Sequence, residues 1–174
     1  TLFIDHPATE LRVLQWQTWQ RNIAGILVWD TTYWTARDDF AQNPYEDPMG
    51  YVAHSRPEEN KGWGNGDGRF LYPPLAAATP GASGNDPILE PPVSSIRWEM
   101  LREGIEDYEC LWLLCELIGK KRSSLTAEQV KTYESLLDVP EAITRDMTTF
   151  TTDPTPIYAR RAAIAEAIER LARD

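Results

Sequence analysis

Residues 25–34 read Gly-Ile-Leu-Val-Trp-Asp-Thr-Thr-Tyr-Trp, and this stretch decides the fold expected from the sequence. Its continuous apolar run, 26–29, is typical of a strand that is buried on both faces of a sheet. The preceding segment, 9–24, has apolar residues mostly three or four apart, which predicts a helix that stops at Gly25. Another short apolar run, 2–4, comes before that helix. Strand, helix and strand within about 30 residues predict a βαβ unit with two parallel strands.

The middle of the chain, 35–93, has a different composition. It holds nine of the 13 prolines and seven of the 10 glycines, so it is not regular throughout. Several aromatic residues in the same segment argue against disorder, and long loops of this kind are usually functional. Within it, Gly66-Asp67-Gly68 predicts a turn that leads into a short strand at 69–72.

The remaining part, 94–174, is predicted to be helical. A long amphipathic helix runs to about Gly119, a capping-box pattern at 126–129 opens a second helix, and a third covers about 156–173. The expected fold class is therefore α/β, with two parallel strands and a helix-rich C-terminal region. We expect 1–93 and 94–174 to form one structural unit, in which the C-terminal helices pack on the βαβ part.

Composition limits the possible functions. The chain has 174 residues and a formal net charge of −10, which argues against nucleic acid as a partner. No stretch reaches the roughly 20 apolar residues of a membrane-spanning helix, so no membrane partner is expected. The two cysteines lack the spacing of zinc ligands, and we expect no metal or other cofactor. The sequence begins at Thr1 without Met, so we expect a removed targeting segment or a piece of a longer protein.

Aromatic and polar residues follow the apolar run at 26–29. In parallel α/β folds the loops after the carboxyl ends of strands form the ligand site. A Trp ring there can stack on the apolar face of a sugar while a neighbouring carboxylate accepts hydrogen bonds from hydroxyl groups. The same residues can instead cap a turn and fill the rim of the fold. The candidate sugar-contacting residues are Trp29, Asp30, Tyr33, Trp34, Trp63, Asp67 and Tyr72.

Two of these candidates lie in the Gly-rich segment 62–68. Its alternating glycines imitate a phosphate loop, but no Lys-Ser or Lys-Thr follows, so phosphate binding is not indicated. Trp63 and Asp67 are either substrate contacts carried by a loop or parts of a plain turn.

A further candidate is Arg97, at the centre of the apolar face of the long helix. A buried cation is costly unless a carboxylate or a fork of carbonyl groups receives it. Arg97 is therefore interpreted as an organiser behind the site, a structural salt bridge, or a first-turn residue that reaches solvent. Gly104 on the same face allows a neighbouring backbone to approach closely.

No nucleophile or acid pair stands out. The chain lacks the patterns GxSxG and HExxH and contains two histidines. Adjacent acids such as Glu106-Asp107 are interpreted as solvated surface residues, so no catalytic residue is assigned.

Several motifs occur in a fixed order: a helix with Trp16 and Trp19, then Gly25–Trp29, Tyr33-Trp34, Asn43–Pro48, Gly66–Gly68, Leu71–Pro73, Ser95–Glu99, Leu101–Glu109, Thr152–Pro154 and a final helix with Arg160 and Arg161. As an ordered set they resemble the C-terminal part of the bacterial glycoside hydrolase family 123-like proteins, a region also catalogued as the uncharacterised DUF4091 domain. The similarity covers nearly the whole chain.

The resemblance implies a (β/α)8 barrel whose last two strands are 2–4 and 26–29. It also implies an N-acetyl-β-galactosaminidase that uses substrate-assisted retention, in which an adjacent Asp-Glu pair orients the acetamido group and supplies the general acid. This chain contains no Asp-Glu dipeptide. We therefore expect the C-terminal portion of an N-acetylhexosaminidase-like glycosidase that forms a sugar-binding rim without the acid pair.

The expected partners are carbohydrate and the missing N-terminal part of the same protein. The resemblance implies that the whole protein is secreted, periplasmic or exposed at the bacterial cell surface. The alternatives are a non-catalytic carbohydrate-binding module that uses the Trp-rich loop and a helical interaction module.

Overall fold

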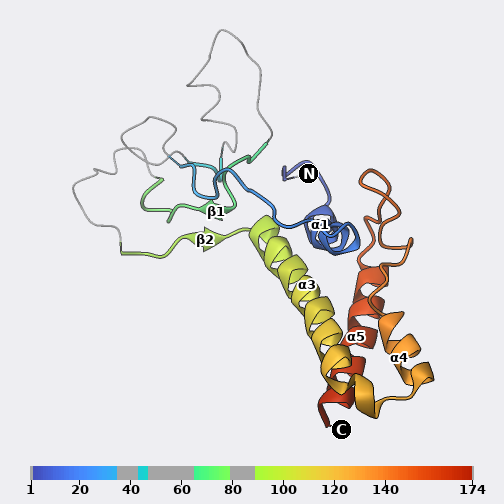
Figure 1. The fold of residues 1–174 in the computed structure, drawn as a ribbon. Coiled ribbons are helices and arrows are strands. Elements are labelled where there is room, and N and C mark those ends of the chain that lie inside the picture. Colours follow the sequence, from blue (N-terminus) through green and yellow to red (C-terminus); the bar gives the residue numbers. More distant parts are fainter. Residues whose placement is uncertain (1, 35–42, 47–64, 79–88, 174) are drawn as a thin grey trace. The chain divides into compact units, whose positions relative to one another are not determined.

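The computed structural model describes residues 2–34, 43–46, 65–78 and 89–173 (Figure 1). The chain divides into two compact units. Unit 1 comprises Thr1–Ala8 and Ile26–Glu99, and unit 2 comprises Thr9–Gly25 and Met100–Asp174. In chain order the elements are α1 (Thr9–Gln20), β1 (Leu71–Tyr72), β2 (Val93–Ser94), α3 (Ile96–Lys121), the 3₁₀ helix η1 (Arg122–Ser124), α4 (Ala127–Glu134) and α5 (Thr155–Arg173).

Unit 1 contains a small antiparallel sheet. Strand β1 pairs with β2, with Leu71 opposite Ser94. Next to β1, Thr32 forms an isolated antiparallel bridge with Arg69, and the backbone N–H of Tyr33 donates to the carbonyl of Gly68 at 2.9 Å. The short strand predicted after the glycine turn is confirmed as β1. Together with the helices, this sheet confirms the prediction that the chain contains both helices and strands.

The parallel strands predicted at 2–4 and 26–29 are not confirmed, and neither is a barrel segment. Residues 3–6 form a bend and turn, and 23–28 carry no regular secondary structure. Among the described residues, no backbone hydrogen bond joins the two segments. A strand needs a neighbouring strand to receive its backbone groups, and an apolar run alone does not supply one. The side chain of Leu27 is accordingly 84% exposed rather than buried.

Unit 2 is built on a helical core. Trp16 of α1, Leu111 and Leu114 of α3, and Ile157 and Ile164 of α5 are all at most 1% exposed. Leu111 and Leu114 are three residues apart and Ile157 and Ile164 are seven apart, so each pair lies on one apolar stripe of its helix. Helix α1, which the sequence predicted between two strands, thus packs with the C-terminal helices.

Local signals in unit 2 explain how its helices meet and begin. A Cβ on Gly104 would lie 3.1 Å from the carbonyl oxygen of Arg12, so this glycine permits the close backbone approach that the sequence predicted. The capping box is confirmed at the start of α4, where Thr126 accepts from the backbone N–H of Gln129 and the Gln129 side chain accepts from the backbone of Thr126. Within the described ranges, no helix is long and apolar enough to cross a membrane.

Candidate functional site

A glycine turn at residues 65–68 organises the candidate site in unit 1. Gly66 and Gly68 have φ angles of +75° and +69°, in the left-handed region that favours glycine. A Cβ on Gly68 would lie 2.5 Å from the ring of Trp29. The sequence Gly-Asp-Gly is therefore required both by the backbone conformation and by the indole packed against it.

Trp29, Tyr33 and Asp67 come together at this turn. The indole Nε1–H of Trp29 donates to Oδ1 of Asp67 at 3.0 Å. The Trp29 and Tyr33 rings meet edge to face, with centroids 5.1 Å apart. Trp29 remains 46% exposed. The arrangement holds a large aromatic surface in a fixed orientation while leaving part of it open to solvent.

Three other candidates have local structural contacts. Oδ1 of Asp30 accepts from the backbone N–H groups of Thr31 at 2.7 Å and Thr32 at 2.9 Å, so this oxygen caps a turn, as one of the two interpretations proposed. The indole of Trp34 donates to the carbonyl of Leu71 at 2.8 Å.

The Tyr72 ring packs edge to face against Tyr45, with centroids 5.1 Å apart. The Tyr45 hydroxyl donates to the carbonyl of Pro73 at 3.0 Å, which fixes this pair beside the end of β1. Trp63 lies outside the described residues.

Arg97 lies directly behind the glycine turn. It is 3% exposed, and its Nη1 donates to the carbonyls of Leu2 and Gly66, both at 2.8 Å. Its Nη2 donates to the carbonyl of Arg69 at 2.6 Å. Of the acceptors considered from the sequence, a fork of carbonyls receives this cation.

The electrostatic setting of Arg97 follows from these contacts. The guanidinium lies 4.8 Å from the centre of the Phe70 ring. Burial lowers the pKa of Arg97, an effect that Tyr72 and Asp67 oppose. No salt bridge joins it to a carboxylate among the described residues.

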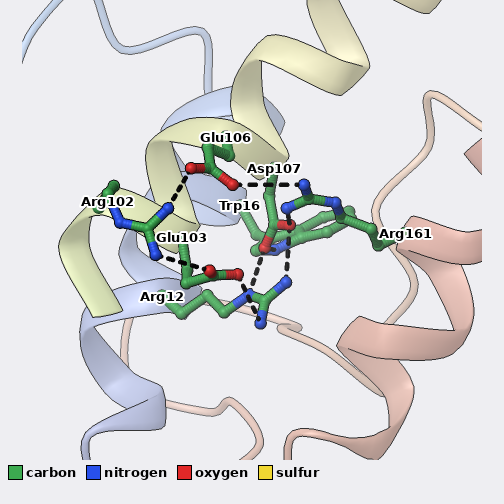
Figure 2. A network of polar contacts seen from close by, with 7 residues as sticks. All are labelled: Arg12, Trp16, Arg102, Glu103, Glu106, Asp107 and Arg161. Atoms are coloured by element: carbon green, nitrogen blue, oxygen red, sulfur yellow. Dashed lines mark hydrogen bonds and ion pairs between the residues drawn. The ribbon is translucent and has the colours of Figure 1, made fainter. Parts of the chain in front are cut away.

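Unit 2 contains a second polar cluster, which the sequence did not reveal (Figure 2). Asp107, 1% exposed, accepts from Nε and Nη2 of Arg12 at 2.6 and 2.8 Å. It also accepts from Nε1 of Trp16 at 2.9 Å and from Nη1 of Arg161 at 2.6 Å. Figure 2 shows these groups converging on one carboxylate, with Glu103, Glu106 and Arg102 around them.

The interpretation of Asp107 as a solvated surface acid was therefore wrong. Adjacent acids on a helix lie about 100° apart, so one can face the core while its neighbour is partly exposed. The useful signal was Arg12, which lies four residues before Trp16 and hence on the same buried face of α1. Its hydrogen bonds with Asp107 raise the pKa of Arg12 despite its burial.

The Asp107 cluster is saturated and balanced in charge. Four donors occupy its two oxygens, which leaves little capacity for a substrate. Its arginines are paired with acids that include Glu103, 3.5 Å from Arg12. The cluster is suited to structural support, whereas the unit 1 turn presents an exposed aromatic surface. In the part of the chain that the structure describes, no group of three or more His, Cys, Asp or Glu side chains could hold a metal ion.

The catalytic domain of glycoside hydrolase 123 matches residues 1–114 of the 174. This chain belongs to the glycoside hydrolase 123 family. Its function is accordingly related to glycoside hydrolysis, with carbohydrate as the class of ligand. A search of curated proteins found no match. The match contains the whole unit 1 turn and its aromatic neighbours, and it ends within α3.

Proposed function

We propose that this chain forms part of the sugar-binding rim of an N-acetylhexosaminidase-like glycoside hydrolase and does not supply the catalytic acid pair. The observation that carries the proposal is the Trp29 indole, half exposed yet fixed by Asp67 and Tyr33, inside the segment that matches the catalytic domain. Sugar sites commonly combine an aromatic surface with a few fixed polar groups.

In this proposal the Trp29 ring stacks on the apolar C–H face of a sugar. Asp67 fixes the ring through one carboxylate oxygen, and its other oxygen accepts a hydrogen bond from a sugar hydroxyl. Tyr33 supports the edge of the indole and limits its rotation. Because the ring is already ordered, less conformational entropy is lost when the sugar binds. Tyr72, Trp34 and Trp63 extend the rim.

The acid pair and the earlier strands of a (β/α)8 barrel are proposed to come from a preceding part of the same protein. Two observations support this arrangement. The sequence contains no Asp-Glu dipeptide. The apolar side chains of Ile4, Ile26 and Leu27 are 40%, 41% and 84% exposed, which is unfavourable unless further strands cover them. The runs 2–4 and 26–29 then become the last two strands of the barrel.

The first test is a binding titration with N-acetyl-D-galactosamine, followed by tryptophan fluorescence. We expect Trp29→Ala to weaken binding about fivefold or more, since an aromatic stacking surface contributes roughly 1 kcal/mol. The matched control is Trp112→Ala, because Trp112 is 51% exposed and lies in unit 2. Equal binding by wild type and Trp29→Ala would contradict the proposed rim.

The second test concerns turnover. The 174-residue chain should not hydrolyse p-nitrophenyl N-acetyl-β-D-galactosaminide, and co-expression with the preceding part of the protein should restore hydrolysis. Hydrolysis by the chain alone would contradict an acid pair located elsewhere. Sugar binding without restored hydrolysis would favour a non-catalytic carbohydrate-binding module instead.

A further inference from the structure

The Gly66–Gly68 turn is held from two directions. On one side, the carbonyl of Gly66 accepts a hydrogen bond from Arg97. A Cβ at position 66 would lie 2.7 Å from Nη2 of Arg97, so the glycine leaves room for the guanidinium. On the other side, Gly68 has no Cβ, and this leaves room for the Trp29 ring. Asp67, between these glycines, holds the indole. A shift of the turn therefore moves Asp67 and Trp29 together.

Arg97 fixes more than the turn alone. Its three carbonyl acceptors belong to Leu2, Gly66 and Arg69, which come from two separate stretches of the chain. A planar guanidinium can serve several acceptors at once in a fixed geometry, which an ammonium group on a flexible stem cannot do. The backbone N–H of Ile4 also donates to the carbonyl of Asn65 at 2.9 Å. The N-terminal stretch is therefore bonded both to Arg97, through Leu2, and to the turn, through Ile4.

The cost of this arrangement points to a role. A desolvated cation that is bound to carbonyls is only partly compensated, because dipoles neutralise less charge than a carboxylate does. An apolar side chain at position 97 would avoid that cost but would release three carbonyls from their donor. With Arg97 in place, these carbonyls stay bonded, and one of them belongs to the turn whose Asp67 holds the indole of Trp29.

Resting on the proposed function, we propose that Arg97 is a positioning residue for the sugar site. It orients Trp29 and Asp67 through the Gly66–Gly68 turn and does not itself contact the sugar.

The experiment uses the indole N–H signals of the tryptophans in ¹H–¹⁵N spectra, together with affinity for N-acetyl-D-galactosamine. The Trp29 signal is assigned by its loss in Trp29→Phe. Trp16 and Trp19 serve as internal references, because their indoles donate to Asp107 and to the carbonyl of Leu137 within unit 2. A general loss of structure would move all of these signals, whereas a positioning role moves the Trp29 signal alone among them.

We expect Arg97→Met to shift the Trp29 indole signal and to weaken sugar binding at least tenfold, while the Trp16 and Trp19 signals stay in place. Arg97→Lys should rescue part of both effects, because it retains the charge and one donor centre. The matched control is the same pair of substitutions at Arg102, which lies on α3 with its side chain 51% exposed and should change neither reading.

Should Arg97→Met fail to fold, Gly66→Ala disturbs the same contact together with the turn itself, because its Cβ would lie 2.7 Å from both Nη2 of Arg97 and Cδ1 of Ile4 at a positive φ. An unchanged Trp29 signal and unchanged affinity in a folded Arg97→Met or Gly66→Ala variant would overturn the proposal, as would an equal shift of all three indole signals. Failure of the proposed function looks different: Trp29→Ala then leaves sugar affinity unaltered, while the Trp29 signal still reports whether Arg97 positions the ring.

Discussion

Arg12 in unit 2 and Arg97 in unit 1 are both 3% exposed, yet different acceptors receive them. Arg12 forms a two-point ion pair with Asp107, and its pKa is raised. Arg97 donates to the backbone carbonyls of Leu2, Gly66 and Arg69, and burial lowers its pKa. The first arginine is compensated by a carboxylate in direct contact, and the second mainly by carbonyl dipoles, with Asp67 and Tyr72 opposing part of the cost of burial.

The difference teaches where to look for function. The charge-balanced cluster centres on a fully buried carboxylate whose two oxygens are already occupied by donors, which suits structural support. The carbonyl-bound cation lies behind an exposed indole and a turn whose two glycines have positive φ. Perturbed pKa values and special backbone conformations concentrate at functional sites, because packing alone does not favour them. This contrast supports unit 1 as the location of the sugar rim.

The largest expected effect tests whether unit 2 depends on residues after the family match. A chain truncated after Leu114 loses Ile118, Ile143, Ile157, Ile164 and Leu171 from a core that also contains Trp16. We expect the helices of unit 2 to lose cooperative unfolding, measured by circular dichroism during urea denaturation. A truncated chain with an intact, cooperative transition would show that the core is not shared in this way.

The next effect tests the carboxylate side of the comparison. Asp107→Asn leaves Arg12 buried without its counter-charge and should lower the free energy of unfolding by about 3–5 kcal/mol. Glu106→Gln is the control: its side chain is 42% exposed, so the loss should stay below about 1 kcal/mol. Similar losses in the two variants, measured in urea, would mean that burial of the acid is not what matters.

A smaller effect is expected from the turn itself. Gly68→Ala forces a Cβ against the Trp29 ring at a positive φ, and should cost about 1–3 kcal/mol while also weakening sugar binding. Gly119→Ala on α3 meets open space and should leave stability unchanged or raise it by up to about 1 kcal/mol. Thermal unfolding and the sugar titration check both variants. Unchanged sugar affinity in Gly68→Ala would show that sugar binding by Trp29 does not depend on the conformation of the turn.

The smallest expected effect is a pH dependence confined to unit 2. Hydrogen bonds from Thr148, and then from Arg145 and Thr149, lower the pKa of the exposed Asp146 carboxyl. A carboxyl with a lowered folded pKa stabilises the protein above its ordinary value of 3.8, and this contribution is lost as the pH falls through the folded pKa. Asp146→Asn should therefore flatten the loss of thermal stability between about pH 5 and about pH 2. An unchanged slope would exclude this loop as its source.

Arginine titration does not interfere with that measurement. Arg12 and Arg97 stay protonated throughout the acidic range, so neither buried guanidinium contributes to the slope. Among the described residues, Asp153 is the other acid with a lowered pKa, since it accepts from the backbone N–H and hydroxyl of Thr155. Asp153→Asn provides a second acid-side variant for comparison.

Local signals in the sequence predicted much of the helical part. The capping box at Thr126, the spacing of Ile157 and Ile164, and the small residue Gly104 each act over one or two helical turns, so a single sequence contains them. The turn at Gly66–Gly68 was also predictable, because a left-handed backbone conformation requires a particular residue type.

Pairing over long sequence distances was not predictable. The apolar run 26–29 has the composition of a buried strand, but composition does not specify which backbone lies beside it. The Asp107 cluster joins residues 95 and 54 positions apart, and no local pattern announces such a contact. At the candidate site, the sequence indicated the residue types, while the Trp29–Asp67 contact depends on a turn 38 residues away.

The hydrogen bond between Arg161 and Asp107 has a consequence for how this family can diverge. Asp107 lies inside the segment that matches the catalytic domain, whereas Arg161 lies 47 positions beyond the last matched residue. In a relative without the residues after position 114, the carboxylate equivalent to Asp107 would have one arginine partner fewer, and the helical core would lose the apolar side chains of α5. Relatives that keep the residues after position 114 should therefore also keep an aspartate at position 107, together with the arginine at position 12 and the tryptophan at position 16.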